Sequence, residues 1–296
     1  MNKLRVITGL FLLCIAVSAF GQPKIGISGT VEWDKMEINA VVSLDMASAG
    51  LRLPNGRMQS EALIAAEYVR LISPGIMNLQ VDSSSNIADL VSRGEWNSFD
   101  VENFALQVRS VPPALSPDFS SFLASYTLGM GEISTALIRH RRPADIPRTL
   151  NPVPAPAYTG IVIIASENLP IHGTKSAAQV RPCLFPKIWD TEMNLIYERN
   201  MLNPEAGTMV RYFTAREIFT GGPSGLSPEI TAVVGSHPLR IFARGVFGIN
   251  PTDPIIGRED ALQIISIEEN RALLREGRVA VIIDEALLKN PLSNGN

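Results

Sequence analysis

The chain carries three histidines, His140, His172 and His237, and none stands at a spacing typical of metal ligands. A helical zinc site would need a second histidine four positions away, with cysteine or acidic residues close by. His140 lies beside arginines, which disfavour a bound cation, and the other two lie among Gly, Ser and Pro residues in expected loops. We therefore expect all three to be structural or exposed, and the sequence predicts no metal ligands.

A nucleophilic serine lacks its usual surroundings. Hydrolases that place the serine on a strand-to-helix turn carry it in the pattern G-x-S-x-G. The nearest approaches are Gly222-Pro223-Ser224-Gly225 and Gly235-Ser236-His237, and neither matches. The first segment is more simply a loop with proline punctuation. The phosphate loop and the G-x-G-x-x-G dinucleotide pattern are also missing, so no cofactor-binding residues are predicted.

Paired carboxylates are the remaining route to catalysis, because secreted glycosidases depend on them. The candidates are Asp34 with Glu37, Asp190 with Glu192, and Asp284 with Glu285. The first two pairs fit polar hairpin turns, and the third follows an apolar strand, where we expect it to cap the next segment. Aromatic residues make up 6% of the chain, and the three tryptophans, Trp33, Trp96 and Trp189, are far apart. Single tryptophans favour core anchors over a carbohydrate-stacking groove.

The loop from Asp82 to Asp89 alternates oxygen-bearing side chains and could in principle hold calcium. It lacks the spacing and the terminal glutamate of an EF-hand loop, whereas a helix cap explains its residues. No catalytic residue is therefore predicted, and we expect a protein that is not an enzyme.

Residues 1–21 have the form of a cleavable export signal. Lys3 and Arg5 precede an apolar core from Val6 to Val17, and small residues end the segment, which predicts cleavage after Gly21. Cys14 follows three large apolar residues, whereas a lipidated cysteine needs a small one before it, so we expect no lipid there. The signal predicts a periplasmic location.

The composition of the remaining chain limits its partners. Lys3 and Arg5 leave with the signal, so 24 basic residues face 29 acidic ones, and this balance gives no reason to bind nucleic acid. No later stretch approaches the length of a membrane helix. Cys183 is then the only cysteine, so no internal disulfide can form, and its apolar neighbours favour a buried thiol over an exposed one that pairs with another protein.

The first part of the chain mixes strands and helices. Alternating residues predict a β-hairpin from 25–33 and 36–46, turning at Asp34-Lys35. Helical spacing follows over 61–72, with Ser60 as its cap and Ser73-Pro74-Gly75 as its end. A short helix over 87–91 and strands over 104–111 and 122–128 complete this part. Without a repeating strand–helix–strand order, an antiparallel sheet is expected.

Residues 141–157 contain five prolines and no apolar periodicity, so they predict a semi-rigid linker. Arg141-Arg142 at its start could attract an acidic partner, but solvated charges are the favoured interpretation. Beyond it we expect strands over 160–165, 239–246, 264–267 and 278–284, a hairpin over 184–189 and 194–197, and a helix over 268–276.

The fold class predicted is α+β, as two units with mainly antiparallel sheets and few short helices. The boundaries are a signal over 1–21, an N-terminal domain over 22–140, the linker over 141–157, a β-rich C-terminal domain over 158–290 and a tail over 291–296.

Several segments resemble the periplasmic flagellar assembly T-type proteins and related small outer-membrane lipoproteins. They are Gln59–Val91, Tyr158-Thr159-Gly160-Ile161, Pro186–Asp190, Asp260–Ile264 and Val279–Asp284. The first is similar to a family pattern of helix, I-x-x-x-x-V-D strand and serine-rich turn. The chain departs from the lipoprotein members because no lipid-bearing cysteine follows the signal. The resemblance implies an envelope or motor-associated scaffold and supplies no catalytic residues.

Two functions of different classes remain. The first is a non-enzymatic envelope protein that acts through contacts with other envelope or flagellar proteins. The second is a binding module for a small ligand or glycan between the two units, across the linker, because clefts between domains are common binding places. A secreted hydrolase ranks third. The oligomeric state is left open.

Overall fold

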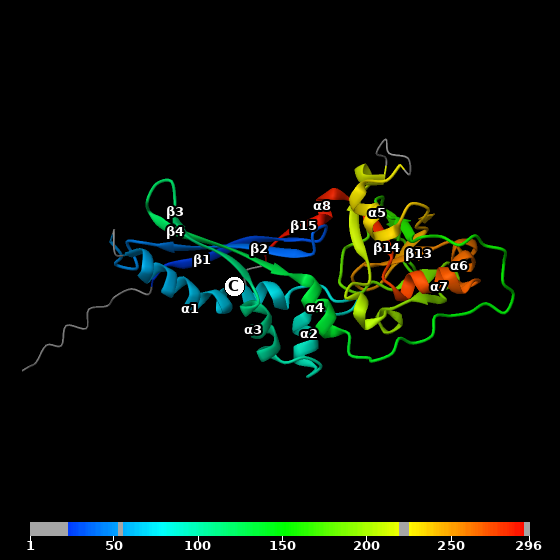
Figure 1. The fold of residues 1–296 in the computed structure, drawn as a ribbon, viewed down its shortest axis with the longest axis horizontal. Coiled ribbons are helices and arrows are strands. Elements are labelled where there is room, and N and C mark those ends of the chain that lie inside the picture. Colours follow the sequence, from blue (N-terminus) through cyan, green and yellow to red (C-terminus); the bar gives the residue numbers. More distant parts are fainter. Residues whose placement is uncertain (1–22, 53–55, 219–224, 293–296) are drawn as a thin grey trace, which may run out of the picture.

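The structure is a computed structural model that describes residues 23–52, 56–218 and 225–292. The predicted signal over 1–21, with Cys14 and the cleavage after Gly21, lies outside these residues, as does Ser224. Two units lie side by side along the longest axis, as Figure 1 shows, and together they form the predicted α+β fold with mostly antiparallel sheets. Within the described ranges, no helix is both long and apolar enough to cross a bilayer.

The first unit is built on a five-stranded antiparallel sheet in the order β15-β1-β2-β4-β3. Its strands are β1 (Ile25–Glu32), β2 (Glu37–Asp45), β3 (Arg109–Leu115), β4 (Ser121–Gly129) and β15 (Lys289–Pro291). Alternate residues of β2, such as Ile38 and Val42, are buried, while their neighbours are half-buried. This alternation confirms the predicted hairpin, and Met36 adopts a positive φ of 55° in its turn.

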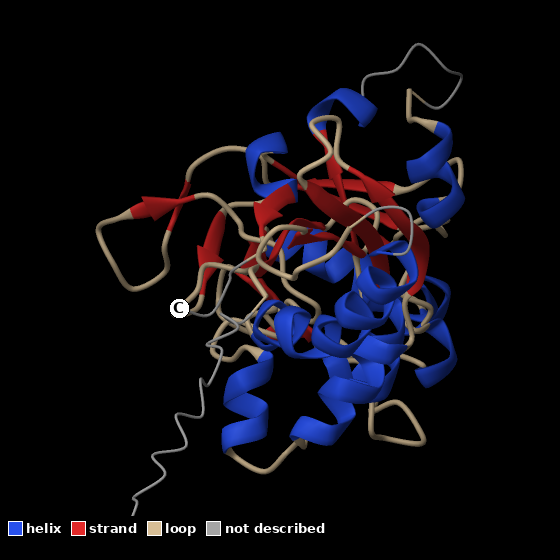
Figure 2. Ribbon diagram, turned by 90° about the vertical axis from the view of Figure 1, so that its left-hand side faces the viewer, coloured by secondary structure: helices blue, strands red, loops and turns tan. Residues whose placement is uncertain are grey.

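Helices cover one face of this sheet. They are α1 (Gly56–Met77), α2 (Ile87–Ser92), α3 (Ser98–Leu106) and α4 (Met130–Leu137). In Figure 2 most of the helices lie below the strands. The sheet therefore buries the apolar side chains of β2 against helices on this side.

Three details of the first unit differ from the sequence prediction. Helix α1 begins five residues before Glu61, and Ser60 lies buried inside it with its hydroxyl donating to the Arg57 carbonyl at 2.6 Å. The helix also continues past Pro74, because Gly75 and Ile76 are buried and packing outweighs the lost backbone bond. Phe104 belongs to α3, so the strand predicted over 104–111 was wrong at its start, and β3 begins at Arg109.

The core of the second unit is a four-stranded sheet in the order β10-β14-β5-β11. The strands are β5 (Ile161–Ile164), β10 (Arg211–Thr214), β11 (Leu239–Phe242) and β14 (Val279–Ile283). All three pairings are parallel, so this sheet departs from the antiparallel pattern. Parallel strands are covered on both faces, and accordingly every residue of β14 is buried.

Helices α5 (Pro228–Val234), α6 (Arg258–Ile265) and α7 (Glu268–Arg275) lie in the connections between these strands. The strand predicted over 264–267 was wrong, because Ile264 and Ile265 end α6. Ala261 and Ile264 stand three residues apart and are both buried, which is helical spacing.

A second, mixed sheet flanks this core in the order β12-β13-β8-β9. It contains β8 (Ile188–Asp190), β9 (Leu195–Tyr197), β12 (Gly245–Phe247) and β13 (Asp253–Ile256), and β8 with β9 forms the predicted hairpin. The remaining elements are the pair β6 (Leu169–Pro170) and β7 (Ala177–Ala178), helix α8 (Glu285–Leu288), and 3-10 turns at Arg199–Met201, Pro204–Ala206 and Ala215–Ile218.

The proline-rich segment 141–157 contains no helix or strand. Hydrogen bonds fasten it to the second unit, from Ala144 N to the Asn200 carbonyl at 2.7 Å and from Val153 N to Ser266 Oγ at 3.1 Å. Ile146 is buried, at 1% exposure. The segment is therefore part of the surface of the second unit rather than a spacer between separated bodies.

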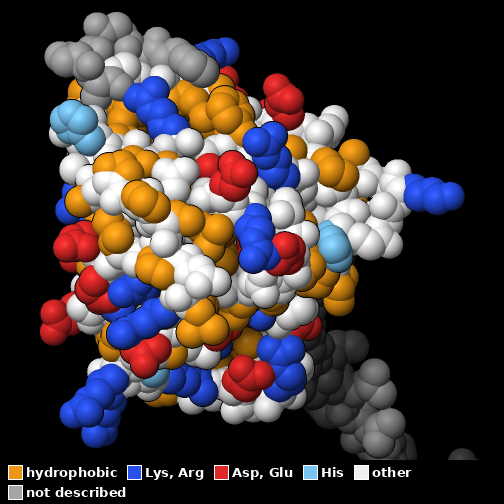
Figure 3. All heavy atoms as spheres, turned by 90° about the vertical axis from the view of Figure 1, so that its right-hand side faces the viewer, with side chains coloured by type: hydrophobic (Ala, Val, Ile, Leu, Met, Phe, Trp, Pro, Cys, Tyr) orange, Lys and Arg blue, Asp and Glu red, His pale blue; other side chains and the backbone are white. Residues whose placement is uncertain are grey.

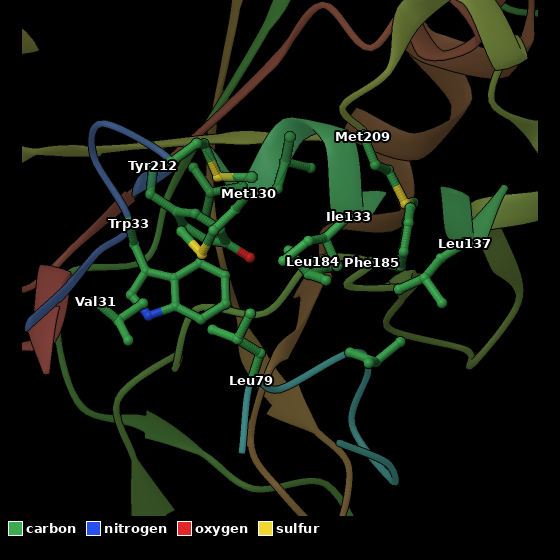
Figure 4. Close-up of a cluster of buried hydrophobic side chains, with 14 of the residues drawn as sticks. Val31, Trp33, Leu79, Met130, Ile133, Leu137, Leu184, Phe185, Met209 and Tyr212 are labelled. Carbon is green, nitrogen blue, oxygen red and sulfur yellow. The ribbon is translucent and has the colours of Figure 1, made fainter. Parts of the chain in front are cut away.

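The two units share one hydrophobic core at their junction. Figure 4 shows Val31, Trp33, Leu79, Met130, Ile133 and Leu137 of the first unit packed against Leu184, Phe185, Met209 and Tyr212 of the second. Backbone bonds add to this contact, from Leu184 N to the Gln80 carbonyl at 3.0 Å and from Phe185 N to the Val81 carbonyl at 2.8 Å. When the two units pack together, the burial of these side chains removes apolar surface of both units from water.

The C-terminal strand crosses back to the first unit. Thr30, Val31 and Glu32 of β1 pair with Pro291, Asn290 and Lys289 of β15. Residues 289–291 thus belong to the sheet of the first unit, whereas the sequence placed a domain end at 290 and a tail from 291. A three-residue strand carries too little pattern to be seen in the sequence.

Candidate functional site

The three histidines lie in separate surroundings. His140 Nε2 donates to the Leu202 carbonyl at 2.7 Å, and His172 contacts the Phe247 ring with centroids 6.0 Å apart. Within the described ranges, no three His, Cys, Asp or Glu side chains are grouped as metal ligands.

Ser236 and His237 come closest to a catalytic arrangement. Ser236 Oγ lies 2.8 Å from His237 Nδ1, but both residues are neighbours in one loop and their contact is exposed. The described part of the chain offers no carboxylate that would orient this imidazole. A serine nucleophile needs a base that is itself held in place, so the contact does not form a triad.

The three carboxylate pairs hold local structure. Asp190 Oδ1 accepts from the backbone of Glu192 at 2.9 Å and of Asn194 at 2.8 Å, which closes the β8–β9 turn, while Glu192 pairs with Arg258. The neighbouring acids therefore point to different partners and do not face a common substrate position.

In each of the other two pairs, the two acidic residues also contact different partners. Glu37 pairs with Arg109 at 2.6 Å across the first sheet, whereas the backbone carbonyl of Asp34 accepts from Arg211 at 3.3 Å. Asp284 Oδ1 caps α8 through Ala286 N at 2.8 Å, as predicted, and Glu285 pairs with Arg216 at 3.2 Å.

The loop over 82–89 is explained as a helix cap. Asn86 and Asp89 form a reciprocal capping box on α2, with both bonds at 2.9 Å. Asp82 Oδ1 accepts from Ser84 N, and the Ser83 carbonyl accepts from Asn250 N at 2.9 Å. The oxygen atoms of this loop thus accept hydrogen bonds from the loop itself and from the second unit.

The tryptophans and the cysteine are structural. Trp33 contacts Tyr212, Trp96 contacts Phe104 and Trp189 contacts Phe247, so the three indole rings lie apart. Cys183 is buried, as predicted, and burial raises the pKa of its thiol above the ordinary value. The Tyr212 hydroxyl hydrogen-bonds to the Cys183 backbone at both N and O, at 3.1 and 2.9 Å.

An apolar groove on the first unit is the strongest candidate for contact with another protein. It has a volume of about 290 Å³ and lies between α1, the end of α3 and strand β3. We call it the α1–β3 groove; its lining includes Ala65, Val69, Leu106, Val111 and Pro112. Leu106 is 66% exposed and Val111 is 62% exposed. Large apolar side chains that line a hollow and remain in water mark a contact surface.

The floor of the groove is a pair of stacked tyrosines. The rings of Tyr68 and Tyr126 have centroids 3.9 Å apart and an interplanar angle of 19°. Burial raises the pKa of Tyr68, and its hydroxyl is enclosed with no hydrogen-bond partner in the described parts of the chain. A buried hydroxyl without a partner costs free energy, so the stacked pair is held in place by packing rather than by a hydrogen bond of Tyr68.

Charge and further apolar residues extend the groove. Glu61 is the only ionisable acid or base besides the tyrosines among its described lining, and it forms no ion pair there. Phe99 is 66% exposed and stands two helical turns before Leu106, on the same face of α3. Met58, 80% exposed, stands two turns before Ala65 on α1.

The sequence did not indicate this groove, because Leu106 and Val111 were assigned to one predicted strand over 104–111. In such a strand alternate side chains are buried in the core, so no exposed apolar surface was expected there. The pair Pro112-Pro113 was the available signal. Proline in a strand indicates an edge, and β3 is an edge strand with a register shift between Val111 and Ala114.

A second hollow lies at the junction of the units. Its lining comes from both units and from the C-terminal strand, but no residue of the 141–157 segment lines it. The prediction that such a cleft would lie across the linker is therefore wrong.

Charges elsewhere are mixed. On the face in Figure 3, basic and acidic side chains are interspersed over the second unit, and no continuous basic surface is seen there.

Two protein-family models match the chain. Residues 24–136 match the N-terminal domain of Treponema pallidum Tp0624, and residues 160–285 match the second domain of the same protein. The two matches follow the two units and leave β15 outside. A comparison with curated protein sequences gives no match.

Proposed function

From its similarity to two consecutive domains of Treponema pallidum Tp0624 and from its surface, we propose that this chain is an exported, non-enzymatic envelope protein that acts through contact with another protein. The observation that carries the proposal is the α1–β3 groove, where Leu106 and Val111 remain exposed beside the buried, unpartnered Tyr68 hydroxyl. An apolar anchor that enters such a hollow gains most of its binding free energy from desolvation, with a polar rim that gives specificity.

The groove indicates the chemistry of its partner. Ala65, Val69 and Pro112 can contact apolar side chains, and the unpaired Glu61 complements a lysine or arginine. The partner segment is therefore apolar with one basic residue. A flagellar partner is the specific form of this proposal, and it rests on the sequence resemblance alone.

The order of the two matched domains supports the interpretation that the two units function together as one scaffold. The same two domain types occur as N-terminal and second domains in one Treponema pallidum protein. Their shared core in this chain fits a rigid scaffold that presents the groove in a fixed orientation.

The test is site-specific photo-crosslinking in cells, with the crosslinker placed at Leu106 or Val111. The matched control is Phe242, which is 62% exposed on β11 of the second unit. We expect a discrete protein adduct from the groove positions, lost in Glu61→Lys, and none from position 242. Equal adducts at all three positions, or adducts that persist in Glu61→Lys, would contradict the proposal.

Export and the flagellar link have their own measurements. Mass spectrometry of the protein from a periplasmic fraction should give Gln22 as its first residue. Deletion of the gene should reduce motility or envelope integrity, and recovery of a cytoplasmic chain that starts at Met1 would count against export.

A further inference from the structure

The hollow at the junction, which we call the junction cleft, is built from five separated parts of the chain. It has a volume of about 210 Å³. Its lining residues are Val31 and Trp33 from the first hairpin, Gly75 and Asn78–Gln80 from the end of α1, Arg181 and Pro182, Asn250 and Thr252, and Leu287, Asn290 and Pro291. The cleft exists only when both units and β15 are in place.

Donors and acceptors in the cleft are left free by the rest of the protein. The Arg181 guanidinium and the side-chain amides of Asn78 and Asn250 have no partner among the described residues. Gln80 and Asn290 use their amide N–H groups on backbone carbonyls, at 2.6 and 3.4 Å, which leaves both amide oxygens available. These groups could bind both the donors and the acceptors of a ligand.

The charge of the cleft has one sign. Arg181 is the only ionisable side chain in the described lining, which contains no Asp or Glu. A guanidinium binds a carboxylate through two parallel hydrogen bonds, so an anionic carboxylate is the group it fits.

One wall is apolar. Figure 4 places Val31, Trp33 and Leu79 together at this end of the shared core, and Pro182, Leu287 and Pro291 also line the cleft. Sites for drug-sized ligands are larger, at roughly 300–1,000 Å³. A cleft of about 210 Å³ therefore suits a smaller ligand with small apolar substituents.

We propose that the junction cleft binds a short peptide through its free C-terminal carboxylate. The carboxylate lies on Arg181, the peptide groups hydrogen-bond to Asn78, Gln80, Asn250 and Asn290, and small side chains lie on the wall of Val31 and Leu79. Asn78 and Asn250 can each donate and accept, and Gln80 and Asn290 offer amide oxygens, so together they match the N–H and C=O groups of a peptide.

The site is independent of the α1–β3 groove and has a mechanical consequence. Leu287, Asn290 and Pro291 line the cleft from the segment that pairs with β1, so a bound peptide contacts the first unit, the second unit and β15 together. Binding must then slow the opening of β15, since a ligand that binds only the closed form stabilises it.

The experiment uses the full mature chain and measures binding by calorimetry with N-acetyl-Ala-Ala and with its C-terminal amide. We expect the acid to bind at least tenfold more tightly than the amide, and glucuronic acid to bind more weakly than the acid. Arg181→Gln should weaken the acid at least tenfold and leave the amide unchanged, while Arg148→Gln, an exposed arginine of the 141–157 segment, should change neither.

Hydrogen exchange provides a second readout. Saturating N-acetyl-Ala-Ala should slow amide hydrogen exchange at Asn290 and Leu292 in the unchanged protein and not in Arg181→Gln. Equal binding of acid and amide, unchanged binding in Arg181→Gln, tighter binding of glucuronic acid, or no binding of the acid at millimolar concentration would each overturn the proposal. These outcomes leave the groove proposal untouched, because no groove residue lines the cleft.

Discussion

Trp33 of the first unit meets Tyr212 of the second edge to face, with ring centroids 6.0 Å apart and an interplanar angle of 81°. Both rings are nearly fully buried, at 3% and 1% exposure. Aromatic pairs in this geometry contribute about 0.5–1.5 kcal/mol beyond the area they bury. The contact therefore couples the folding of one unit to that of the other.

Replacing the indole should destabilise both units together. We expect Trp33→Ala to lower the free energy of unfolding by about 3–5 kcal/mol, because a large cavity opens in the shared core. Urea unfolding followed by circular dichroism should remain one transition at a lower midpoint. Phe99→Ala, at a 66% exposed position, is the control and should stay within about 0.5 kcal/mol of the unchanged protein. Separate transitions for the two units would show that the shared core does not couple them.

The C-terminal strand gives a second prediction. Trp33 N donates to the Leu288 carbonyl and Leu292 N donates to the Gly29 carbonyl, at 2.9 and 2.8 Å, so position 290 lies in the hydrogen-bonding phase between them. Asn290→Pro removes a donor there and should detach β15, at a cost of about 3 kcal/mol or less since the strand is at an edge.

Hydrogen exchange at Val31 and Trp33, whose N–H groups face β15, should then accelerate, while exchange in β14 of the second unit stays slow. The native Pro291 acts as an internal control, because it pairs with Thr30 in the opposite phase and is tolerated. Unchanged exchange along β1 in Asn290→Pro would mean that β15 adds little to the sheet.

The elements that the sequence predicted well are those whose pattern is local and long. Nine residues of β2 alternate between buried and half-buried positions, and the turn at Asp34-Lys35 is short, so the hairpin could be read directly. The cap at Asn86 and the strand β14 were likewise encoded in a few adjacent residues.

The parallel sheet of the second unit could not be predicted with the same means. Its strands β5 and β10 have four residues each, too few to show a period, and the apolar pair at the end of α6 was taken for a strand. With that helix missed, the strand–helix–strand order that indicates parallel pairing was hidden.

Neither candidate site is visible in the sequence, for a geometric reason. The junction cleft brings together Val31, Arg181 and Asn290, which are more than a hundred residues apart along the chain. Tyr68 and Tyr126 stack through the register of β2 and β4 and the placement of α1. The spacing of residues in the sequence indicates only which side chains share one face of a single helix or strand, not which elements meet in the fold.

The acid side of the stability profile should depend on Glu268. Hydrogen bonds from Arg275 and Arg271, at 2.6 and 2.7 Å, hold the pKa of this carboxyl below its ordinary value of 4.5. The folded state thus binds a proton less readily than the unfolded state. The resulting stabilisation is complete above about pH 4.5 and is lost as the pH falls through the lowered pKa.

Glu268→Gln should therefore cost about 0.5–1 kcal/mol at pH 7, a small value because the carboxylate is 54% exposed, and the difference should shrink as the pH falls below the ordinary pKa of 4.5. Glu269→Gln is the matched control, since it also lies in the first turn of α7 but forms no ion pair in the described structure. Urea midpoints of the three proteins across pH 3–7 give the comparison. A constant difference between Glu268→Gln and the unchanged protein at every pH would rule out the ion pairs as its cause.

The thiol of Cys183 should be inert in the native protein. Its side chain is 1% exposed, and burial raises its pKa, so both access and the thiolate fraction are low. We expect no reaction with iodoacetamide at pH 8 over a time in which Ser110→Cys, at an exposed position of β3, reacts completely. In urea above the unfolding midpoint, the two thiols should react at similar rates, and peptide mass mapping identifies which one is modified. Native labelling at Cys183 would mean that the packing around this residue opens readily, because the Tyr212 hydroxyl, held on both backbone groups of Cys183, must move before the reagent can enter.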